Sequence, residues 1–143
     1  MMMTTAIMCM ALNIYWEARG EFIPGQYAVA SVTLNRAGSD KNICRVVTEP
    51  NQFSWTTKLV DYRGKVPVLK PAGYPKDERA WALAQHIAKY AMKNRVDFVD
   101  GANHYHATSV RPKWVTAQAV RTHRFGKHIF YRLPTKSQLT GHA

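Results

Sequence analysis

The chain carries the stretch Ile14-Tyr15-Trp16-Glu17-Ala18-Arg19-Gly20-Glu21 near its start, at the end of an apolar run with helical spacing. Glu17 and Glu21 stand at positions i and i+4, which share a helix face with Cβ atoms about 5–6 Å apart. Neighbouring carboxylates repel and aromatic rings exclude water, so this pair favours an acid that keeps its proton near neutral pH. Such an acid is the proton donor that glycosidic bonds need. The alternative is an acidic pair on a solvated helix end, with Arg19 as a screening neighbour.

Length and composition indicate a folded globule. The chain has 143 residues, 46% of them hydrophobic, and four Trp, which excludes wholesale disorder. This length suits one domain with a sizeable core. We expect a single domain over residues 1–143, with residues 133–143 as a flexible tail.

The charge is strongly basic, with 20 Lys and Arg against 9 Asp and Glu and a formal net charge of +11. Such a field attracts polyanions, which include nucleic acids, anionic membrane faces and the acidic polymers of a bacterial envelope. A basic nucleic-acid-binding module without catalysis is therefore one alternative. The basic residues are scattered and no recognised binding motif is present, so we expect no specific nucleic-acid partner.

The N-terminal region and the two cysteines bear on the cellular compartment. Residues 1–15 are apolar but lack the basic start and the cleavage site of a signal peptide. They are also too few for a membrane span, which needs about 20 apolar residues. We therefore expect the first helix of the mature fold here. Two cysteines make no disulfide framework, and we expect Cys9 to be a buried free thiol rather than bonded to Cys44.

Periodicity and turn residues predict a mainly helical α+β fold. Thr4 or Thr5 caps a first helix that ends at Gly20, with Ile7 in its buried stripe. Pro24 and Gly25 mark a turn before a second helix over 26–36. Further along we expect helical turns at 43–47, a loop or short strand at 50–55, a surface connection at 58–75, an Asp77-capped helix at 78–95, an extended segment at 103–107, a short helix at 116–121 and a strand at 126–132. The short strands or loops would form one wall of a cleft beside a helical core.

The segment Gln52-Phe53-Ser54-Trp55 alternates polar and aromatic residues. Phe53 and Trp55, together with Trp16, are candidates to desolvate Glu17 and to stack on sugar faces. The amide of Gln52 and the hydroxyl of Ser54 suit the hydrogen bonds of a sugar or its N-acetyl group. The alternatives are core positions for the aromatic residues and local turn bonding for the polar ones.

His104 and His106 stand on one face of the expected extended segment, and Tyr105 stands on the other. A His-x-His pair invites a zinc site, and therefore a zinc amidase or peptidase, but zinc takes a third protein ligand. None of the remaining histidines has a telling spacing, so we prefer imidazoles that line a polar groove and expect no metal and no cofactor. No GxSxG or phosphate-binding glycine motif is present.

Several blocks of the sequence, in order, resemble the SleB-type cell-wall hydrolases, the family of spore-cortex-lytic enzymes and related phage endolysins. The resemblance covers about residues 11–131. The matching blocks are Ala11-Leu12 through Glu17-Ala18-Arg19-Gly20-Glu21, Gly25-Gln26-Tyr27-Ala28-Val29-Ala30, Leu34-Asn35-Arg36, Ile43-Cys44-Arg45-Val46-Val47, Gln52-Phe53-Ser54-Trp55, Gly101-Ala102-Asn103-His104-Tyr105-His106-Ala107 and Gly126-Lys127-His128-Ile129-Phe130-Tyr131.

The resemblance implies a lysozyme-like fold that acts on the glycan strands of peptidoglycan. It implies Glu17 as the catalytic acid and Glu21 as a second acid of less defined role. It also implies a saccharide groove lined by the residues of two blocks, namely Gln52, Phe53, Ser54, Trp55, His104, Tyr105 and His106. Unlike the spore enzymes, this chain shows no peptidoglycan-binding repeat and no export signal. We therefore expect a monomeric phage endolysin, made in the host cytoplasm and acting on the wall in the periplasm after another protein permeabilises the membrane.

The expected reaction is cleavage of the β-1,4 bond between N-acetylmuramic acid and N-acetylglucosamine, with Glu17 protonating the glycosidic oxygen. A retaining hydrolase needs a second carboxylate about 5–5.5 Å away, for which Glu21, Asp61, Asp97 and Asp100 are candidates. Without one, the muramoyl 6-hydroxyl attacks and a 1,6-anhydro sugar forms. The resemblance favours this lytic transglycosylase over a hydrolytic muramidase.

Overall fold

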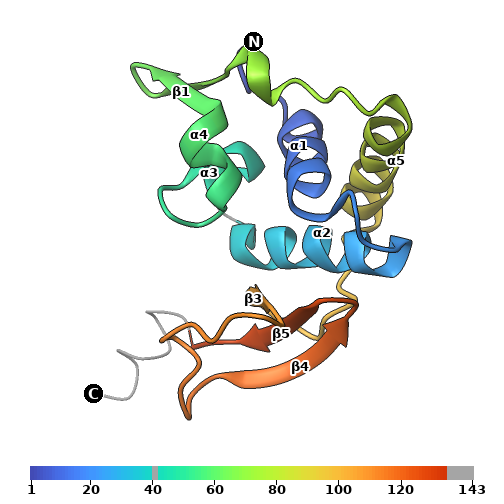
Figure 1. Cartoon of the computed structure of the whole chain (residues 1–143), viewed down its shortest axis with the longest axis vertical. Coiled ribbons are helices and arrows are strands. Elements are labelled where there is room, and N and C mark those ends of the chain that lie inside the picture. Colours follow the sequence, from blue (N-terminus) through green and yellow to red (C-terminus); the bar gives the residue numbers. More distant parts are fainter. Residues whose placement is uncertain (40–41, 135–143) are drawn as a thin grey trace.

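The structure is a computed structural model that describes residues 1–39 and 42–134, and helix α1 (Ala6–Ala18) lies at the centre of its helical part (Figure 1). The Thr5 side chain caps α1 and accepts a hydrogen bond from the Met8 N–H at 3.3 Å, as predicted. All residues from Cys9 to Tyr15 are buried, so the helix is enclosed on every side. The first turn lies outside this buried stretch, and Ile7, which was expected in the buried stripe, is 42% exposed.

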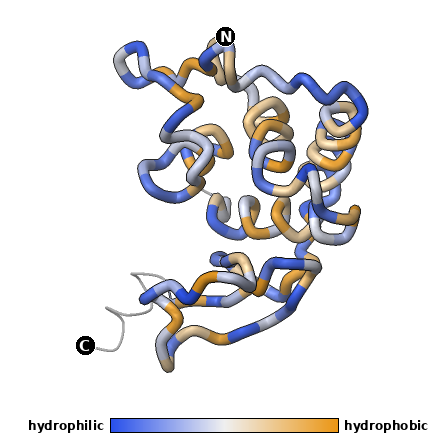
Figure 2. The backbone as a smooth tube through the Cα atoms, viewed as in Figure 1, coloured by the Kyte–Doolittle hydropathy of each residue, from blue (hydrophilic) through white to orange (hydrophobic). Residues whose placement is uncertain are grey.

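Four further helices surround α1 in the described part of the chain, namely α2 (Ile23–Ala37), α3 (Ile43–Thr48), α4 (Ser54–Leu59) and α5 (Glu78–Asn94). Figure 2 shows that hydrophobic residues concentrate along α1, α2 and α5. As predicted, the Asp77 side chain caps α5 by accepting from the Ala80 N–H at 3.1 Å. The expected turn at Pro24 and Gly25 is wrong. Both residues lie in the first turn of α2, where proline is tolerated because its missing N–H has no helical partner.

Residues 58–75, expected as a surface connection, contain regular structure instead. Strands β1 (Val60–Arg63) and β2 (Val66–Leu69) form an antiparallel hairpin, and a 3-10 helix, η1, follows at Pro71–Gly73. The N-terminal segment adds to this hairpin through the Met3 N–H, which donates to the Pro67 carbonyl at 2.9 Å. Three of the four β1 residues are exposed, so the alternation of apolar and polar residues that reveals a half-buried strand is absent.

A three-stranded antiparallel sheet lies on the other side of α2 from the remaining helices (Figure 1). Its order is β3 (His104–Ala107), β5 (His128–Arg132), β4 (Val120–Phe125). The predictions of an extended segment at 103–107 and a strand at 126–132 are confirmed. The helix expected at 116–121 is wrong, because residues 120–125 pair with β5. A small core between α2 and the sheet consists of Ala28, Val32, Val99, Ala102 and Phe130.

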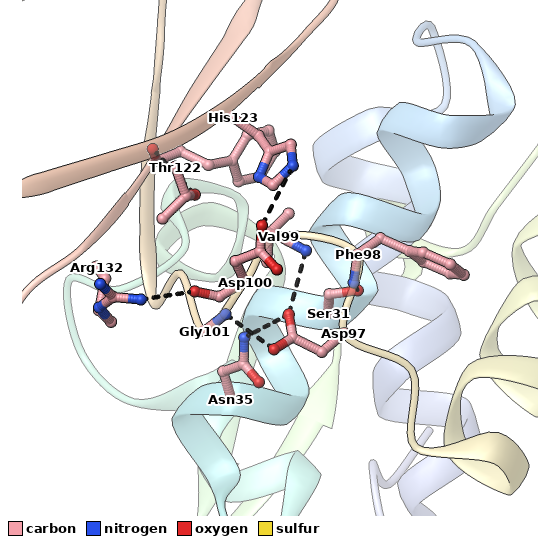
Figure 3. Close-up of polar contacts among 11 residues, drawn as sticks. Ser31, Asn35, Asp97, Phe98, Val99, Asp100, Gly101, Thr122, His123 and Arg132 are labelled. Carbon is pink, nitrogen blue, oxygen red and sulfur yellow. Dashed lines mark hydrogen bonds and ion pairs between the residues drawn. The ribbon is translucent and has the colours of Figure 1, made fainter.

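The loop between α5 and β3 attaches the sheet to α2 (Figure 3). The Asp97 carboxylate accepts hydrogen bonds from the Gly101 N–H at 2.8 Å and from the Asn35 side-chain amide at 3.3 Å. The Phe98 N–H donates to the Ser31 hydroxyl at 3.0 Å. These contacts fix where β3 begins relative to α2. Of the expected tail 133–143, residues 135–143 lie outside the described residues.

Cys9 and Cys44 form a disulfide between α1 and α3, so the expected free thiol is wrong. The two cysteines are 35 residues apart in the sequence, and only the packing of α3 on α1 brings them together. No helix among residues 1–39 and 42–134 combines the length and apolarity needed to cross a membrane.

Candidate active site

Glu17 lies in the last turn of α1 and faces a cavity of about 480 Å³. Three parts of the fold meet there: the end of α1, the segment 51–57 that includes the start of α4, and strands β3 and β5. The described residues that line the cavity are Glu17, Asn51, Gln52, Ser54, Thr57, Tyr105, His106, Ala107 and His128. The first acid of the opening stretch therefore lies where the helices meet the sheet.

The hydroxyl of Tyr105 donates a hydrogen bond to the Oε1 atom of Glu17. Burial and the neighbouring Glu17 raise the pKa of Tyr105 well above its usual value of 10.0, so the phenol remains a donor. The strand alternation is as predicted, since His104 and His106 both pack against Trp114, with ring centroids 5.2 and 5.6 Å away. The structure thus makes Tyr105 a direct partner of the acid.

Arg36 lies in α2 behind this pair. Its Nε atom donates to the Asn103 carbonyl at 2.6 Å, and its guanidinium carbon lies 4.8 Å from the centre of the Phe53 ring. The side chain is largely buried, and its charge acts on both Glu17 and Tyr105. A fixed cation near a buried carboxyl stabilises the ionised form of that carboxyl.

Opposing effects set the proton affinity of Glu17. Burial raises the pKa of Glu17 above its usual 4.5, while the Tyr105 hydrogen bond and the Arg36 charge act in the opposite direction. Burial is the largest of the three effects, so the net shift is upward. Burial therefore favours the protonated form of Glu17, and its anion has both a donor and a cation nearby.

Glu21 does not share a helix face with Glu17, which corrects the predicted acidic pair. Helix α1 ends at Ala18, and Glu21 lies in the bend that follows. Its carboxylate lies 3.7 Å from Nδ1 of His128, which lines the cavity. A Cβ at Gly126, which has φ +56°, would collide with the Glu21 carboxylate. Glu21 therefore contacts His128, which lines the cavity, and is not itself among the described lining residues.

The segment 52–55 divides its side chains between the cavity and the core. Gln52 and Ser54 line the cavity, as predicted for hydrogen-bonding groups. Phe53 and Trp55 are only 1% and 7% exposed and belong to the main core. The Trp55 indole N–H donates to the Asn13 side-chain oxygen at 2.9 Å. The predicted stacking of Phe53 and Trp55 on a sugar does not fit this burial.

The remaining predicted aromatic and histidine residues have separate environments. Trp16 donates its indole N–H to the Gly73 carbonyl at 3.0 Å and packs against the core. His106 lines the cavity and lies within hydrogen-bond distance of the Tyr131 hydroxyl, at 3.1 Å. His104 is not among the lining residues, and burial together with the Arg36 charge lowers its pKa to about 4. His104 is therefore neutral near pH 7 and acts as a packing residue against Trp114.

No group of three His, Cys, Asp or Glu side chains suited to hold a metal ion is found within residues 1–39 and 42–134. The other candidate acids also lie away from the cavity. Asp61 is exposed on β1, Asp97 binds the loop and α2, and Asp100 lies 3.5 Å from His123. Glu17 is the only carboxylate among the described residues that line the cavity.

The sequence did not point to Arg36, Asn51, Thr57 or His128 as residues of a saccharide site. Arg36 and His128 belong to blocks that carry the family resemblance, which is the signal that could have singled them out. His128 reaches the cavity through the pairing of Ala107 with His128 between β3 and β5. Such pairing joins distant parts of the chain, and local patterns do not reveal it.

The comparisons with known proteins identify the family and the fold. A family model described as Cell Wall Hydrolase matches residues 20–131, a region that begins just after Glu17. The catalytic domain of the germination-specific lytic transglycosylase SleB from Bacillus anthracis is 26% identical, with a TM-score of 0.67 over 91% of this chain and 96% of that one. The catalytic domain of the Bacillus cereus SleB protein is 28% identical, with a TM-score of 0.66 over 89% of each chain. No curated protein sequence matches the chain. The mixed α+β fold is that of the SleB catalytic domains, and the chain belongs to the SleB-type cell-wall hydrolase family.

Proposed function

We propose that this protein is a peptidoglycan glycosidase that cleaves the β-1,4 bond between N-acetylmuramic acid and N-acetylglucosamine, with Glu17 as the general acid. The observation that carries the proposal is a largely buried carboxylic acid with a raised pKa, facing a cavity at the junction of helices and sheet. Family membership and the likeness to a structure described as a lytic transglycosylase support the substrate class.

In the first step, Glu17 gives its proton to the glycosidic oxygen while the bond from that oxygen to the muramoyl C1 breaks. Positive charge then develops at C1, and Glu17 is left as a carboxylate. Tyr105 and Arg36 stabilise that carboxylate through a hydrogen bond and a nearby charge. Tyr105 and Arg36, which lower the pKa of Glu17, therefore also favour the transfer of its proton to the glycosidic oxygen.

In the second step, the Glu17 carboxylate takes the proton of the muramoyl 6-hydroxyl, and O6 bonds to C1. The product is a 1,6-anhydro sugar, no water is consumed, and Glu17 regains its proton. A retaining hydrolase would place a second carboxylate about 5–5.5 Å from the first. The described lining residues supply no second carboxylate, and this supports the lytic transglycosylase reaction.

Hydrolysis by a muramidase is the second candidate, and the contact between Glu21 and His128 favours it. His128 lines the cavity, and burial lowers its pKa, so its neutral ring could accept a proton from an attacking water. The carboxylate of Glu21 would then stabilise the imidazolium that forms. This route yields a reducing muramic acid and not an anhydro sugar.

Two measurements test the proposal. Glu17→Gln should lower kcat on purified peptidoglycan by about 10²–10⁴-fold, the usual contribution of a general acid. Glu78→Gln, which removes an exposed acid of α5, is the matched control and should retain activity. Mass spectrometry of the released muropeptides distinguishes anhydro from reducing ends. A Glu17→Gln protein that still degrades peptidoglycan would refute the proposal.

We further propose that the protein is a phage endolysin that reaches the host wall after a separate protein opens the membrane. A disulfide between two buried cysteines supports action in an oxidising compartment. Expression inside bacteria should therefore cause lysis only when the membrane is permeabilised at the same time. Lysis without permeabilisation would contradict this part of the proposal.

The net charge of +11 supports electrostatic contact with an anionic envelope. High salt should reduce lysis of whole walls more than turnover of a short neutral oligosaccharide, because only the wall has a long-range field to screen. Equal losses on both substrates would count against a role for the charge.

A further inference from the structure

A second cavity of about 800 Å³ lies between α3, the β1–β2 hairpin and the N-terminal segment. It shares no lining residue with the cavity of Glu17. The mechanism above does not use it, although it is the larger of the two. We refer to it as the α3 cavity.

The walls of the α3 cavity are fixed to one another. The Tyr62 hydroxyl of the hairpin donates to the Thr48 carbonyl at the end of α3, at 2.6 Å. The Met3 N–H holds the N-terminal segment to Pro67 at 2.9 Å. Cys44, which lines the cavity, is bonded to Cys9 of α1. The cavity is therefore largely formed before any ligand binds, which lowers the entropic cost of binding.

The lining combines exposed charges of both signs with apolar patches. Arg45 and Lys65 supply two cations, and Glu49 supplies one anion. No ion pair involving any of these three is found in the part of the chain that the structure describes. Val66 and Pro67 supply apolar surface. This chemistry suits a short peptide that carries free carboxylates, an amine and small apolar side chains.

Consecutive residues of one turn line the α3 cavity and the Glu17 cavity. Glu49 and Pro50 line the first, and Asn51 and Gln52 line the second. The turn is closed by the Gln52 N–H, which donates to the Glu49 carbonyl at 3.3 Å. A four-residue peptide extends over about 13–14 Å, enough to pass over one turn. A ligand held at Glu17 could thus send a short branch into the α3 cavity.

Peptidoglycan has such a branch, because each unmodified muramoyl residue carries a stem peptide with free carboxylates. We propose that the α3 cavity binds the stem peptide of the muramoyl residue whose glycosidic bond Glu17 cleaves, an inference that rests on the proposed function. Arg45 and Lys65 bind the carboxylates of the stem, and Glu49 binds its free amine. The cavity would make the enzyme selective for glycan strands that carry peptides.

The test compares intact glycan strands with the same strands after an amidase has removed their peptides. Arg45→Ala combined with Lys65→Ala should lower kcat/KM on peptide-bearing strands by about tenfold, mainly through KM, since charge-assisted hydrogen bonds are lost. Activity on stripped strands should be unchanged. Arg79→Ala combined with Lys89→Ala removes the same types of charge from exposed positions of α5 and is the matched control.

Calorimetry with a synthetic stem tetrapeptide gives a second readout that does not depend on turnover. Wild type and the control should bind the peptide, and the Arg45→Ala/Lys65→Ala protein should bind it about tenfold more weakly. Equal losses on both kinds of strand, or equal peptide binding by all three proteins, would overturn the inference while the proposed function stands. If wild type cleaves neither kind of strand, the proposed function fails and this inference fails with it.

Discussion

The Tyr105 hydroxyl donates its hydrogen bond to Glu17 across a sequence separation of 88 residues. One partner belongs to the last turn of α1 and the other to β3, so the contact joins the helical part to the sheet at the cavity. Because the phenol stays protonated, this bond favours the carboxylate form of Glu17 against the effect of burial. The pKa of Glu17, on which the proposed catalysis rests, therefore depends on how the sheet packs against the helices.

Replacing Tyr105 by Phe should raise the pKa of Glu17, because the hydrogen bond that lowers it is lost. Glu17 acts first as an acid, so activity falls once the pH exceeds its pKa. The alkaline limb of the kcat/KM profile should therefore move to higher pH, and the maximal rate should fall by about tenfold because the anion is less stabilised. The measurement is kcat/KM across the pH range.

Arg36→Met should also move the alkaline limb of the kcat/KM profile to higher pH, because the Arg36 charge lowers the pKa of Glu17. The matched control is Lys93→Met, which removes a cation from the exposed last turn of α5 and should leave the profile in place. An alkaline limb that stays fixed in both active-site variants would show that Glu17 is not the titrating acid.

Glu17 should also make stability depend on pH. Burial raises the pKa of Glu17 in the folded state above the usual 4.5. The protonated form therefore contributes its full stability below pH 4.5, and this contribution is lost as the pH rises through the folded-state pKa. Glutamine cannot ionise, and Glu17→Gln should therefore gain stability over wild type as the pH increases. Urea unfolding of both proteins at about pH 4 and about pH 8 measures this difference. A difference that shrinks toward alkaline pH would contradict the buried environment of Glu17.

Reduction of the Cys9–Cys44 bond should lower the free energy of unfolding by about 2–4 kcal/mol, the usual effect of opening a loop of this size. Urea unfolding with and without a thiol reductant measures the change. The Cys9→Ser/Cys44→Ser protein is the control, and its unfolding midpoint should not respond to the reductant. A wild-type midpoint that is equally insensitive would mean that the bond does not form in solution.

Gln52 and Trp55 should differ in what they affect. Trp55→Phe leaves the buried Asn13 oxygen without its donor and should cost about 1–3 kcal/mol of stability, with little change in KM. Gln52→Ala should change stability by no more than about 0.5 kcal/mol, since the residue is exposed, and should raise KM. Thermal unfolding and steady-state kinetics of the two variants separate the roles. A raised KM with unchanged stability in Trp55→Phe would show that Trp55 contacts the saccharide.

Local signals predicted much of the helical framework and singled out Glu17 as the candidate acid. Caps at Thr5 and Asp77 locate the starts of α1 and α5, since a cap and its partner N–H lie within one turn. The extended segments predicted at 103–107 and 126–132 contain β3 and β5. The Glu17 stretch and the ordered blocks around it indicated the family, which the Cell Wall Hydrolase match confirms. Each of these features depends on residues that are close together in the chain.

Tertiary packing alone decided the surroundings of that acid. The Cys9–Cys44 bond, the burial of Phe53 and Trp55, and the position of Glu21 beyond the end of α1 all differ from the sequence expectation. Each depends on how elements far apart in sequence pack, or on where α1 ends. Periodicity tells which face of an element is apolar, but not which other element covers it. The amino-acid sequence by itself therefore singled out Glu17 as the candidate acid, and the docking of the sheet on the helices determined the partners of Glu17 and the direction of its pKa shift.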